Sequence, residues 1–366
     1  MPGRRAQQPP VDNKLCRRCQ QHEPAITVRT EPLCRDCFNK YVQTKVVKRM
    51  ESFRVRHNEP GKERKILLPL SFGTSSLALL HILSLHLKGQ AEKTGRTGFK
   101  LCVVHIDETG SVDHPNVTST LENLRQRYPD HEYSIISLSE IATFEDLSTL
   151  VLANLGLRAE AQGERNIDDL KNDCFAAFLD STESATSRAD VLQLLQRKLI
   201  VHLAKLSDCE AIIWGDSTTR LAERTLAETA KGRGFSLPWI VAAGESPYGI
   251  PCYFPMRDLL SKEIAAFVEL VEPPLVGLVL EKAPKPAVST KNTTIDDLMR
   301  QYFESVEQDY PSIVANVVKT AGKLQASSLS DVEQQCELCE MPLDGQAPER
   351  SRLCYGCIRT LPQGAG

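Results

Sequence analysis

The sequence contains no apolar run near the roughly 20 residues that a membrane-spanning helix requires. The first ten residues, MPGRRAQQPP, carry charge but lack the apolar segment of a secretory signal. These absences argue against a membrane or secreted protein and predict a cytoplasmic one. In that reducing compartment, the twelve cysteines are expected to be thiols or metal ligands rather than disulfides.

The net charge is only −3, but it is unevenly distributed. Residues 1–65 hold 16 Lys and Arg against 7 Asp and Glu, whereas the remainder holds 28 against 40. A basic end of this kind is typical of a segment that contacts a polyanion, although a solvated basic helix gives the same count.

Composition divides the 366 residues into three parts. Residues 1–60 form a basic, cysteine-bearing segment with a helix, 61–325 alternate strand-like and helix-like runs, and 326–366 are polar and cysteine-bearing again. The predicted strands are 66–71, 100–107, 133–138 and 210–215. The predicted helices are 75–87, 146–155, 166–179, 190–206 and 220–231, then 295–309 and 312–324 after a connector at 281–294.

This alternation predicts an α/β fold, a doubly wound parallel sheet with helices on both faces, flanked by two zinc-ribbon-like segments. Ligands of such sheets bind beyond the carboxyl ends of the strands. Residues 71–76, 107–108 and 215–220 are therefore predicted to surround one crevice.

Cysteine pairs with the sequence C-x-x-C occur twice at each end of the chain, and 14 residues separate the two pairs in both cases. Two such pairs complete the tetrahedral site typical of structural zinc. The predicted ligands are Cys16, Cys19, Cys34, Cys37, Cys336, Cys339, Cys354 and Cys357. Disulfides, redox-active pairs and a single site shared between the two ends are the alternatives. The other cysteines, Cys102, Cys174, Cys209 and Cys252, are expected to be mostly packing residues.

The stretch KILLPLSFGTSS, residues 65–76, has the layout of a phosphate-binding site: an apolar strand, a tight loop and the start of a helix. Ser71, Gly73, Ser75 and Ser76 are the candidate nucleotide-binding residues. However, the bulky Phe72 stands where the backbone would approach a phosphate, and the loop has no acidic residue.

Three features together resemble the PP-loop ATP pyrophosphatase family. They are the loop at 71–76, HIDE at 105–108, and WGDSTTRLAERT at 214–225. The family holds ATP with S-G-G-x-D-S and adenylates a substrate carbonyl, often in tRNA. Here Phe72 replaces a glycine and Ser75 replaces the aspartate.

A second family motif, G-H-N-x-D-D-x-x-E-T, is also altered. Gly215 and Glu223 remain, but Asp216 replaces the histidine, and Thr219 and Arg220 replace the acidic pair. A carboxylate pair suits a Mg²⁺ ion, whereas Arg220 opposes one and could hold a phosphate directly. A plain surface role for Arg220 is the alternative.

The cysteine-rich ends make the chain resemble the degenerate member of a heterodimeric tRNA thiolation complex. Catalytic members carry cysteines before the helix that precedes the Gly215 strand and after the helix at 261–270; this chain has none at 181–192 or between Cys252 and Cys336. The resemblance therefore implies that this chain has no catalytic residue and does not hold ATP.

The resemblance also implies a catalytic thiolation subunit as partner, with a thiocarboxylated ubiquitin-related modifier as sulfur donor. The product would be 5-methoxycarbonylmethyl-2-thiouridine at the wobble position of lysine, glutamate and glutamine tRNAs. The basic run at 39–57 is the candidate tRNA contact, with Lys45, Lys48 and Arg49 near one helical face and Arg220 as a further candidate. Two alternatives remain open: an active PP-loop ATPase that adenylates tRNA, and a stand-alone zinc-ribbon RNA-binding protein.

Overall fold

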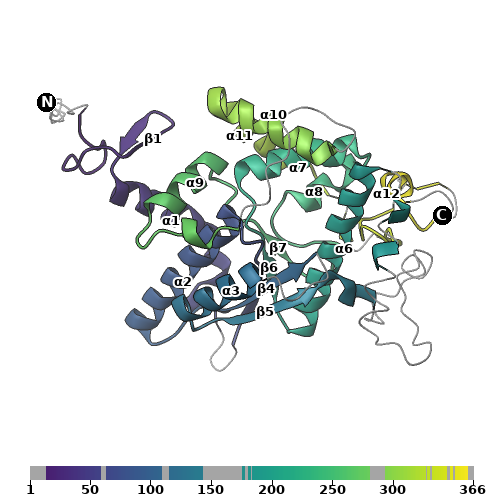
Figure 1. Ribbon diagram of the computed structural model, residues 1–366, viewed down its shortest axis with the longest axis horizontal. Helices are drawn as coiled ribbons and strands as arrows, with labels where there is room; N and C mark the ends of the chain where they lie inside the picture. The colour runs from purple at the N-terminus through teal and green to yellow at the C-terminus, as the bar shows by residue number, and fades with distance from the viewer. Residues whose placement is uncertain are drawn as a thin grey trace, which may run out of the picture.

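The structure, a computed structural model, has a five-stranded parallel sheet at its centre (Figure 1). It describes residues 14–58, 63–108, 115–142, 175–177, 180–182, 184–280, 293–326, 328–329, 332–343, 347–348 and 351–361. The strands, in spatial order, are β5 (Glu132–Ser137), β4 (Lys100–Asp107), β3 (Lys65–Pro69), β6 (Ala211–Ile213) and β7 (Cys252–Tyr253). The predicted α/β fold with a parallel sheet is confirmed.

Alternating side chains of the strands feed two hydrophobic cores, one on each face of the sheet. In β3, Ile66 and Leu68 enter one core and Leu67 enters the other. In β6, Ile213 enters the same core as Ile66, and Ile212 enters the core of Leu67. Both faces are buried because parallel strands connect through helices that cover them, which explains why these strands read as continuous apolar runs.

Helices cover both faces of the sheet (Figure 1). On one face lie α1 (Arg35–Arg49), α2 (Thr74–Thr94), α3 (Pro115–Arg127) and α9 (Ser261–Leu270). On the other lie α6 (Ala185–Leu206), α7 (Thr218–Ala230), α8 (Leu237–Ile240), α10 (Ile295–Asp309), α11 (Pro311–Ala321) and α12 (Tyr355–Thr360). No helix among the described residues is long and apolar enough to cross a bilayer.

Most predicted elements have a counterpart, and the differences have local causes. The helix predicted at 75–87 continues to Thr94, where Gly95 at φ 68° provides the left-handed cap that ends it. The helix predicted at 146–155 lies outside the described residues, and of 166–179 only 175–177 are described, as helix. The strand β7, helix α3 and the hairpin of β1 (Ile26–Val28) and β2 (Glu31–Leu33) were not predicted.

Both cysteine-bearing ends pack against the central sheet domain. Cys16 and Phe38 share a core with Leu68, and Cys354 lies in the opposite core with Leu67. The division of the chain into 1–60, 61–325 and 326–366 remains a prediction.

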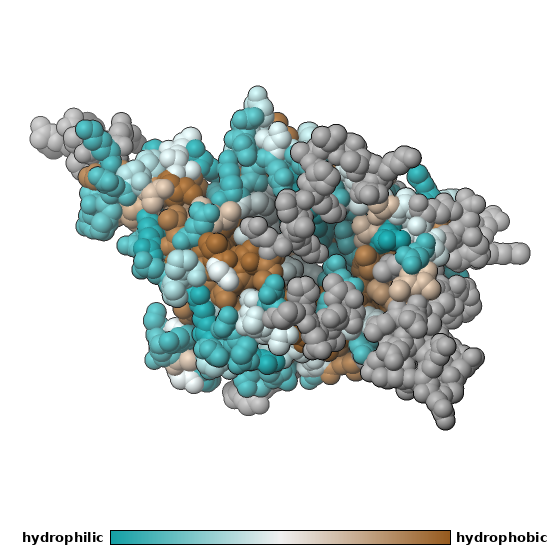
Figure 2. All heavy atoms as spheres, in the orientation of Figure 1, coloured by the Kyte–Doolittle hydropathy of each residue, from teal (hydrophilic) through white to brown (hydrophobic). Residues whose placement is uncertain are grey.

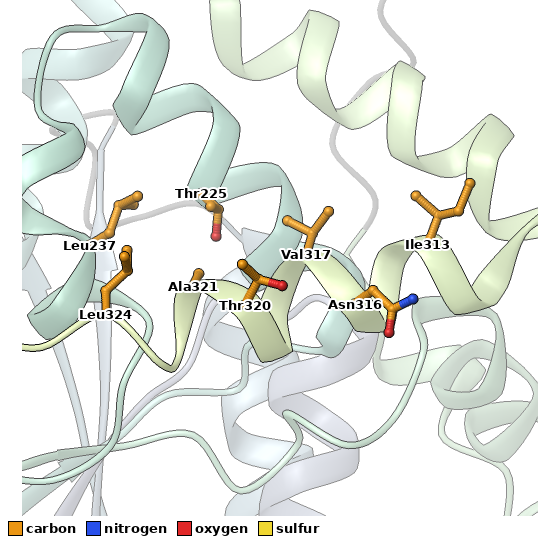
Figure 3. A pocket seen from close by; sticks show the side chains of 8 residues that line it. All are labelled: Thr225, Leu237, Ile313, Asn316, Val317, Thr320, Ala321 and Leu324. Atoms are coloured by element: carbon orange, nitrogen blue, oxygen red, sulfur yellow. The ribbon is translucent and has the colours of Figure 1, made fainter.

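An open and mostly apolar pocket of about 450 Å³ lies between α11, α7 and α8. Figure 3 shows side chains of α11 and the residue Leu324 beyond it on one side, with Thr225 of α7 and Leu237 of α8 on the other. None of its lining side chains is charged, and none belongs to the predicted nucleotide crevice.

A buried histidine in α2 predicts acid sensitivity. His81 is 2% exposed, and its Nδ1 lies 2.6 Å from the Tyr128 hydroxyl. Burial lowers the pKa of His81 from 6.5 to about 4. Between these values the unfolded chain binds a proton that the folded chain does not, so stability falls as pH decreases below 6.5.

We expect the His81 contribution to lower the free energy of unfolding, measured in urea, by about 2 kcal/mol at pH 5 relative to pH 7.5. His81→Gln should reduce that dependence, and His86 and His131, whose pKa values burial also lowers, should account for part of what remains. An unchanged slope in the variant would contradict the assignment.

Candidate functional site

The N-terminal cysteine module, residues 16–37, brings four thiols together. Their sulfur atoms all lie within 4.8 Å of one another, and Cys19 Sγ is 3.7 Å from Cys34 Sγ. The first pair sits in a tight turn, in which the Gln20 N–H donates to the Cys16 carbonyl at 2.9 Å and Gln20 has φ 54°. Cys34 precedes α1 with extended backbone, so the second pair lies at the start of that helix.

The C-terminal cysteine module, residues 336–357, has the same construction. Its four sulfur atoms also lie within 4.8 Å of one another, with 3.9 Å between Cys339 and Cys354. The Glu340 N–H donates to the Cys336 carbonyl at 2.7 Å, and Glu340 has φ 61°. Cys354 precedes α12 with extended backbone, as Cys34 precedes α1.

The two modules correspond residue by residue at an offset of 320. The bond from the Arg17 N–H to the Pro32 carbonyl, at 2.9 Å, has its counterpart from Glu337 to Arg352, at 3.0 Å. The same local fold therefore occurs at both ends of the chain, and each cluster is complete within its own segment. The alternative of one site shared between the ends is wrong.

The thiol clusters fit a tetrahedral metal ion. Metal–sulfur bonds of about 2.3 Å at tetrahedral angles place the sulfur atoms about 3.8 Å apart, close to the two separations given above. Four cysteines and no carboxylate or open position suit a structural zinc ion. Each module can therefore hold one metal ion, and zinc is the expected identity.

The loop between β3 and α2 is closed on itself. Ser71 Oγ and Ser76 Oγ lie 3.1 Å apart, Ser76 Oγ donates to the Gly73 carbonyl at 3.1 Å, and the Gly73 N–H donates to Ser71 Oγ at 3.3 Å. Ser75 lies partly buried in the first turn of α2. Two hydroxyls and one N–H that would face a phosphate thus bond within the loop instead.

Phe72 keeps the loop conformation that a glycine would adopt more easily. Its φ is 55°, a left-handed conformation that costs a non-glycine residue on the order of 1–2 kcal/mol. The side chain is 1% exposed, with its ring centroid 4.8 Å from that of His105. The Phe72 carbonyl accepts from the Leu280 N–H at 3.0 Å. Buried packing therefore offsets the backbone cost.

The second altered motif lies against this loop and carries internal ion pairs. A Cβ on Gly215 would lie 3.1 Å from Ser76 Cα, so any larger residue would crowd the loop at this approach. Arg220 pairs with Glu223 and Arg224 with Asp216, both at 2.8 Å. Burial raises the pKa of Glu223 although Arg220 opposes that shift. The structure thus brings together two of the three segments predicted to share one crevice, at Gly215 and Ser76, and pairs the charged side chains near them.

The basic helix α1 uses two of its candidate residues to bind the protein itself. Lys45 Nζ donates to the Asp258 carbonyl at 2.8 Å and lies 4.5 Å from the Tyr41 ring centroid, and burial lowers the pKa of Lys45. Arg49 makes two bonds, at 2.6 and 2.9 Å, to the Asp258 carboxylate. Lys48 is exposed. Lys45 and Arg49 thus fasten α1 to the loop before α9.

A buried charge cluster, which sequence reasoning missed, lies between α6, α7, α10 and α12. It consists of Asp190, Glu228, Lys231, Arg233 and Asp296. Arg233 binds Asp190 at 2.5 and 2.8 Å and Glu228 at 2.7 Å, and Lys231 binds Asp190 at 2.9 Å and Asp296 at 3.1 Å. The available signals were an aspartate within an apolar helical run and the K-G-R-G that follows α7.

The parallel sheet, its strand–loop–helix edge and the altered loop define a PP-loop-like α/β protein. A U34-tRNA thiolase, NcsA from Methanococcus maripaludis, has a similar fold, with a TM-score of 0.55, 16% identity, and coverage of 88% of this chain and 89% of that chain. The family model described as cytoplasmic tRNA 2-thiolation protein 2 matches residues 294–352.

Curated relatives match over nearly the whole chain. The cytoplasmic tRNA 2-thiolation protein 2 of Phaeosphaeria nodorum is 45% identical over 99% of this chain and 98% of its own length. That of Aspergillus clavatus is 36% identical over 99% of both. The chain belongs to the cytoplasmic tRNA 2-thiolation protein 2 family.

Proposed function

We propose that this chain is the non-catalytic subunit of a cytoplasmic heterodimer that introduces 2-thiouridine into tRNA. Its partner is the catalytic thiolation subunit, which adenylates the 2-carbonyl of the wobble uridine and receives sulfur from a thiocarboxylated ubiquitin-related modifier. The product is 5-methoxycarbonylmethyl-2-thiouridine in lysine, glutamate and glutamine tRNAs. Family membership supports the tRNA-thiolation part of this proposal, and the relatives are named as cytoplasmic proteins.

The closed loop carries the non-catalytic part of the proposal. A phosphate-binding loop needs free N–H and hydroxyl groups that face the anion, whereas here Ser71, Gly73 and Ser76 bond to one another. The nearby Arg220 stands where a Mg²⁺-binding carboxylate would be needed and is paired with Glu223. Binding ATP here would require breaking these contacts, so we assign adenylation to the partner.

The second part of the proposal is that this chain presents tRNA to the partner. The basic first 65 residues contain α1, on which Lys48 is exposed. We propose that Lys48 contacts tRNA phosphates directly. Lys45 and Arg49 hold α1 in place for it, and the Asp258 carboxylate offsets the charge of Arg49. Arg220 remains a weaker candidate because Glu223 offsets its charge.

Reconstituted thiolation of a wobble-uridine tRNA tests this function, with ATP, a sulfur donor and the catalytic subunit. We expect product only when both proteins are present. The double variant Ser71→Ala and Ser76→Ala should retain the rate within about twofold, because less than about 0.5 kcal/mol of activation free energy depends on these hydroxyls. Disabling the corresponding loop of the partner should abolish the product.

Circular dichroism and unfolding of the double variant supply the control that it remains folded. Thiolation that persists with the disabled partner, or that disappears in the folded double variant, would show that this loop is chemically active. The chain would then be an ATP-using enzyme.

A further inference from the structure

The two cysteine modules share one local fold but meet the rest of the protein differently. At the 320-residue offset, the exposed Arg18 corresponds to Leu338, which is 2% exposed. The exposed Asp36 corresponds to the buried Gly356, and the exposed Lys40 corresponds to the buried Thr360. The face that is charged and solvated in the N-terminal module is thus the face by which the C-terminal module docks.

Close contacts fasten the C-terminal module to the charge cluster. A Cβ on Gly356 would lie 2.6 Å from Arg233 Cγ and 2.9 Å from the Lys231 carbonyl oxygen, so the module's backbone rests on this segment. Thr360 Oγ1 donates to Asp190 Oδ2 at 2.9 Å. These contacts tie both ends of α12, the helix that carries Cys357, to Asp190 of α6 and to the segment that follows α7.

A third attachment holds the other pair of cysteines. Lys198 of α6 donates to the Glu337 carbonyl at 2.9 Å and pairs with Glu340 at 3.3 Å. All four cysteines of this module are buried, the most exposed being Cys339 at 4%. A competing ligand can therefore reach the sulfur atoms only when the module opens.

The N-terminal module is more accessible. Cys19 and Cys37 are only partly buried. Its β1–β2 hairpin projects from one end of the molecule, whereas the C-terminal module lies against α6 at the other end (Figure 1). Figure 2 shows mostly hydrophilic side chains over the described part of the projecting end. Its contacts with the sheet domain include the apolar core that Cys16 and Cys34 share with Leu68, and the hydrogen bond from Arg35 to the Leu270 carbonyl at 2.6 Å.

We infer that the two metal sites have different roles. The C-terminal ion is structural and is released only slowly, whereas the N-terminal ion exchanges readily. A metal ion bound by four thiolates leaves by attack of an incoming ligand on an accessible thiolate or after local unfolding. The first route is open at Cys19 and Cys37. The second is the route left to the C-terminal module, where opening must also expose the charge cluster.

Arg233 connects the C-terminal module to the charge cluster. Its side chain packs against the backbone of the module, since a Cβ on Gly356 would lie 2.6 Å from Arg233 Cγ. Burial by itself would lower the pKa of Arg233, but Glu228 and Asp190 raise it well above its usual value, so the guanidinium stays charged. The same side chain therefore supports both the carboxylates of α6 and α7 and the module that carries Cys354 and Cys357.

Zinc release from the full-length, zinc-loaded chain tests the inference. EDTA is added, and the zinc lost from the protein is followed by elemental analysis of desalted samples. We expect two equal phases, with the second at least about tenfold slower because it requires local opening. Cys37→Ser should remove the fast phase and leave the slow one unchanged.

Thr360→Val is the matched test of the attachment, because it removes the hydroxyl that bonds to Asp190 and to the Gly356 carbonyl without changing a metal ligand. It should accelerate the slow phase several-fold and leave the fast phase unchanged. Lys40→Val, at the position of α1 that corresponds to Thr360, should alter neither phase.

Two outcomes would overturn the inference: release of both ions at one rate, or loss of the slow phase in Cys37→Ser. An unchanged slow phase in folded Thr360→Val would show that this attachment does not limit release of the C-terminal ion. A preparation that holds one slowly released zinc, retained in Cys37→Ser, would support the inference, since the exchangeable ion would have been lost during purification.

Discussion

Replacing Asp190 with alanine is expected to lower the free energy of unfolding by about 3–5 kcal/mol, because it breaks a buried ion pair and leaves its cations without their shared partner. Asp190 is 2% exposed and accepts from Arg233, Lys231 and Thr360. Burial alone would raise the pKa of Asp190, but Arg233 and Lys231 lower it, so the carboxylate is charged in the folded protein.

Urea unfolding of the zinc-loaded chain measures this loss. Asp180→Ala is the control, since Asp180 pairs with Arg188 at 3.4 Å while its side chain is 80% exposed; exposed pairs contribute at most about 1 kcal/mol. Equal effects of the two variants would mean that the charge cluster does not stabilise the fold as its contacts imply.

Gly356→Ala is expected to destabilise the C-terminal module by about 1–3 kcal/mol, the usual cost of forcing a methyl group into a packed site. The new Cβ would meet Arg233 Cγ and the Lys231 carbonyl, both closer than 3.0 Å, and the carbonyl is fixed by the backbone. The substitution should also accelerate loss of the C-terminal metal ion.

The correspondence between the two cysteine modules supplies a matched control for Gly356→Ala. Asp36 occupies the equivalent position in the N-terminal module and is exposed in the first turn of α1. Asp36→Ala should therefore cost only the helix-dipole contribution, about 0.3–1 kcal/mol. Unfolding and zinc content are compared for both variants, and a Gly356→Ala protein as stable as wild type would refute the close packing on Arg233.

The two substitutions should also be non-additive. Asp190 and Gly356 both act through Arg233, and residues that share a partner typically show interaction energies of 0.5–3 kcal/mol. We expect the double variant Asp190→Ala and Gly356→Ala to lose less stability than the sum of the single losses, because the module has already been released from the cluster.

Local sequence patterns were sufficient to predict an element where its residue types suit only one environment. Runs such as ILLPL predicted the central strands, because both sides of a parallel strand are buried. The strand β7 has only two residues, too few to show any pattern. The hairpin β1–β2 has only three residues in each strand, too few for an alternating pattern. The turn and the metal-ligating cysteines around it define its place.

The sequence by itself determined the class of protein, the two four-cysteine clusters and the alterations of the nucleotide loop, because each depends on residue identity at short spacing. Tertiary structure alone decided how the charged groups are used. Lys45 and Arg49 read as a phosphate-binding face until Asp258, more than 200 residues away, is placed beside them.

Tertiary structure also distinguishes the two cysteine modules, whose cysteines have the same spacing in the sequence. Only the packing of Gly356 and Thr360 on Arg233 and Asp190 shows that the C-terminal module is attached to the buried charge cluster, by the face that is exposed in the N-terminal module. Ion pairs between distant segments leave no periodic signal along the chain, because their geometry is set by the packing of whole helices rather than by neighbouring residues.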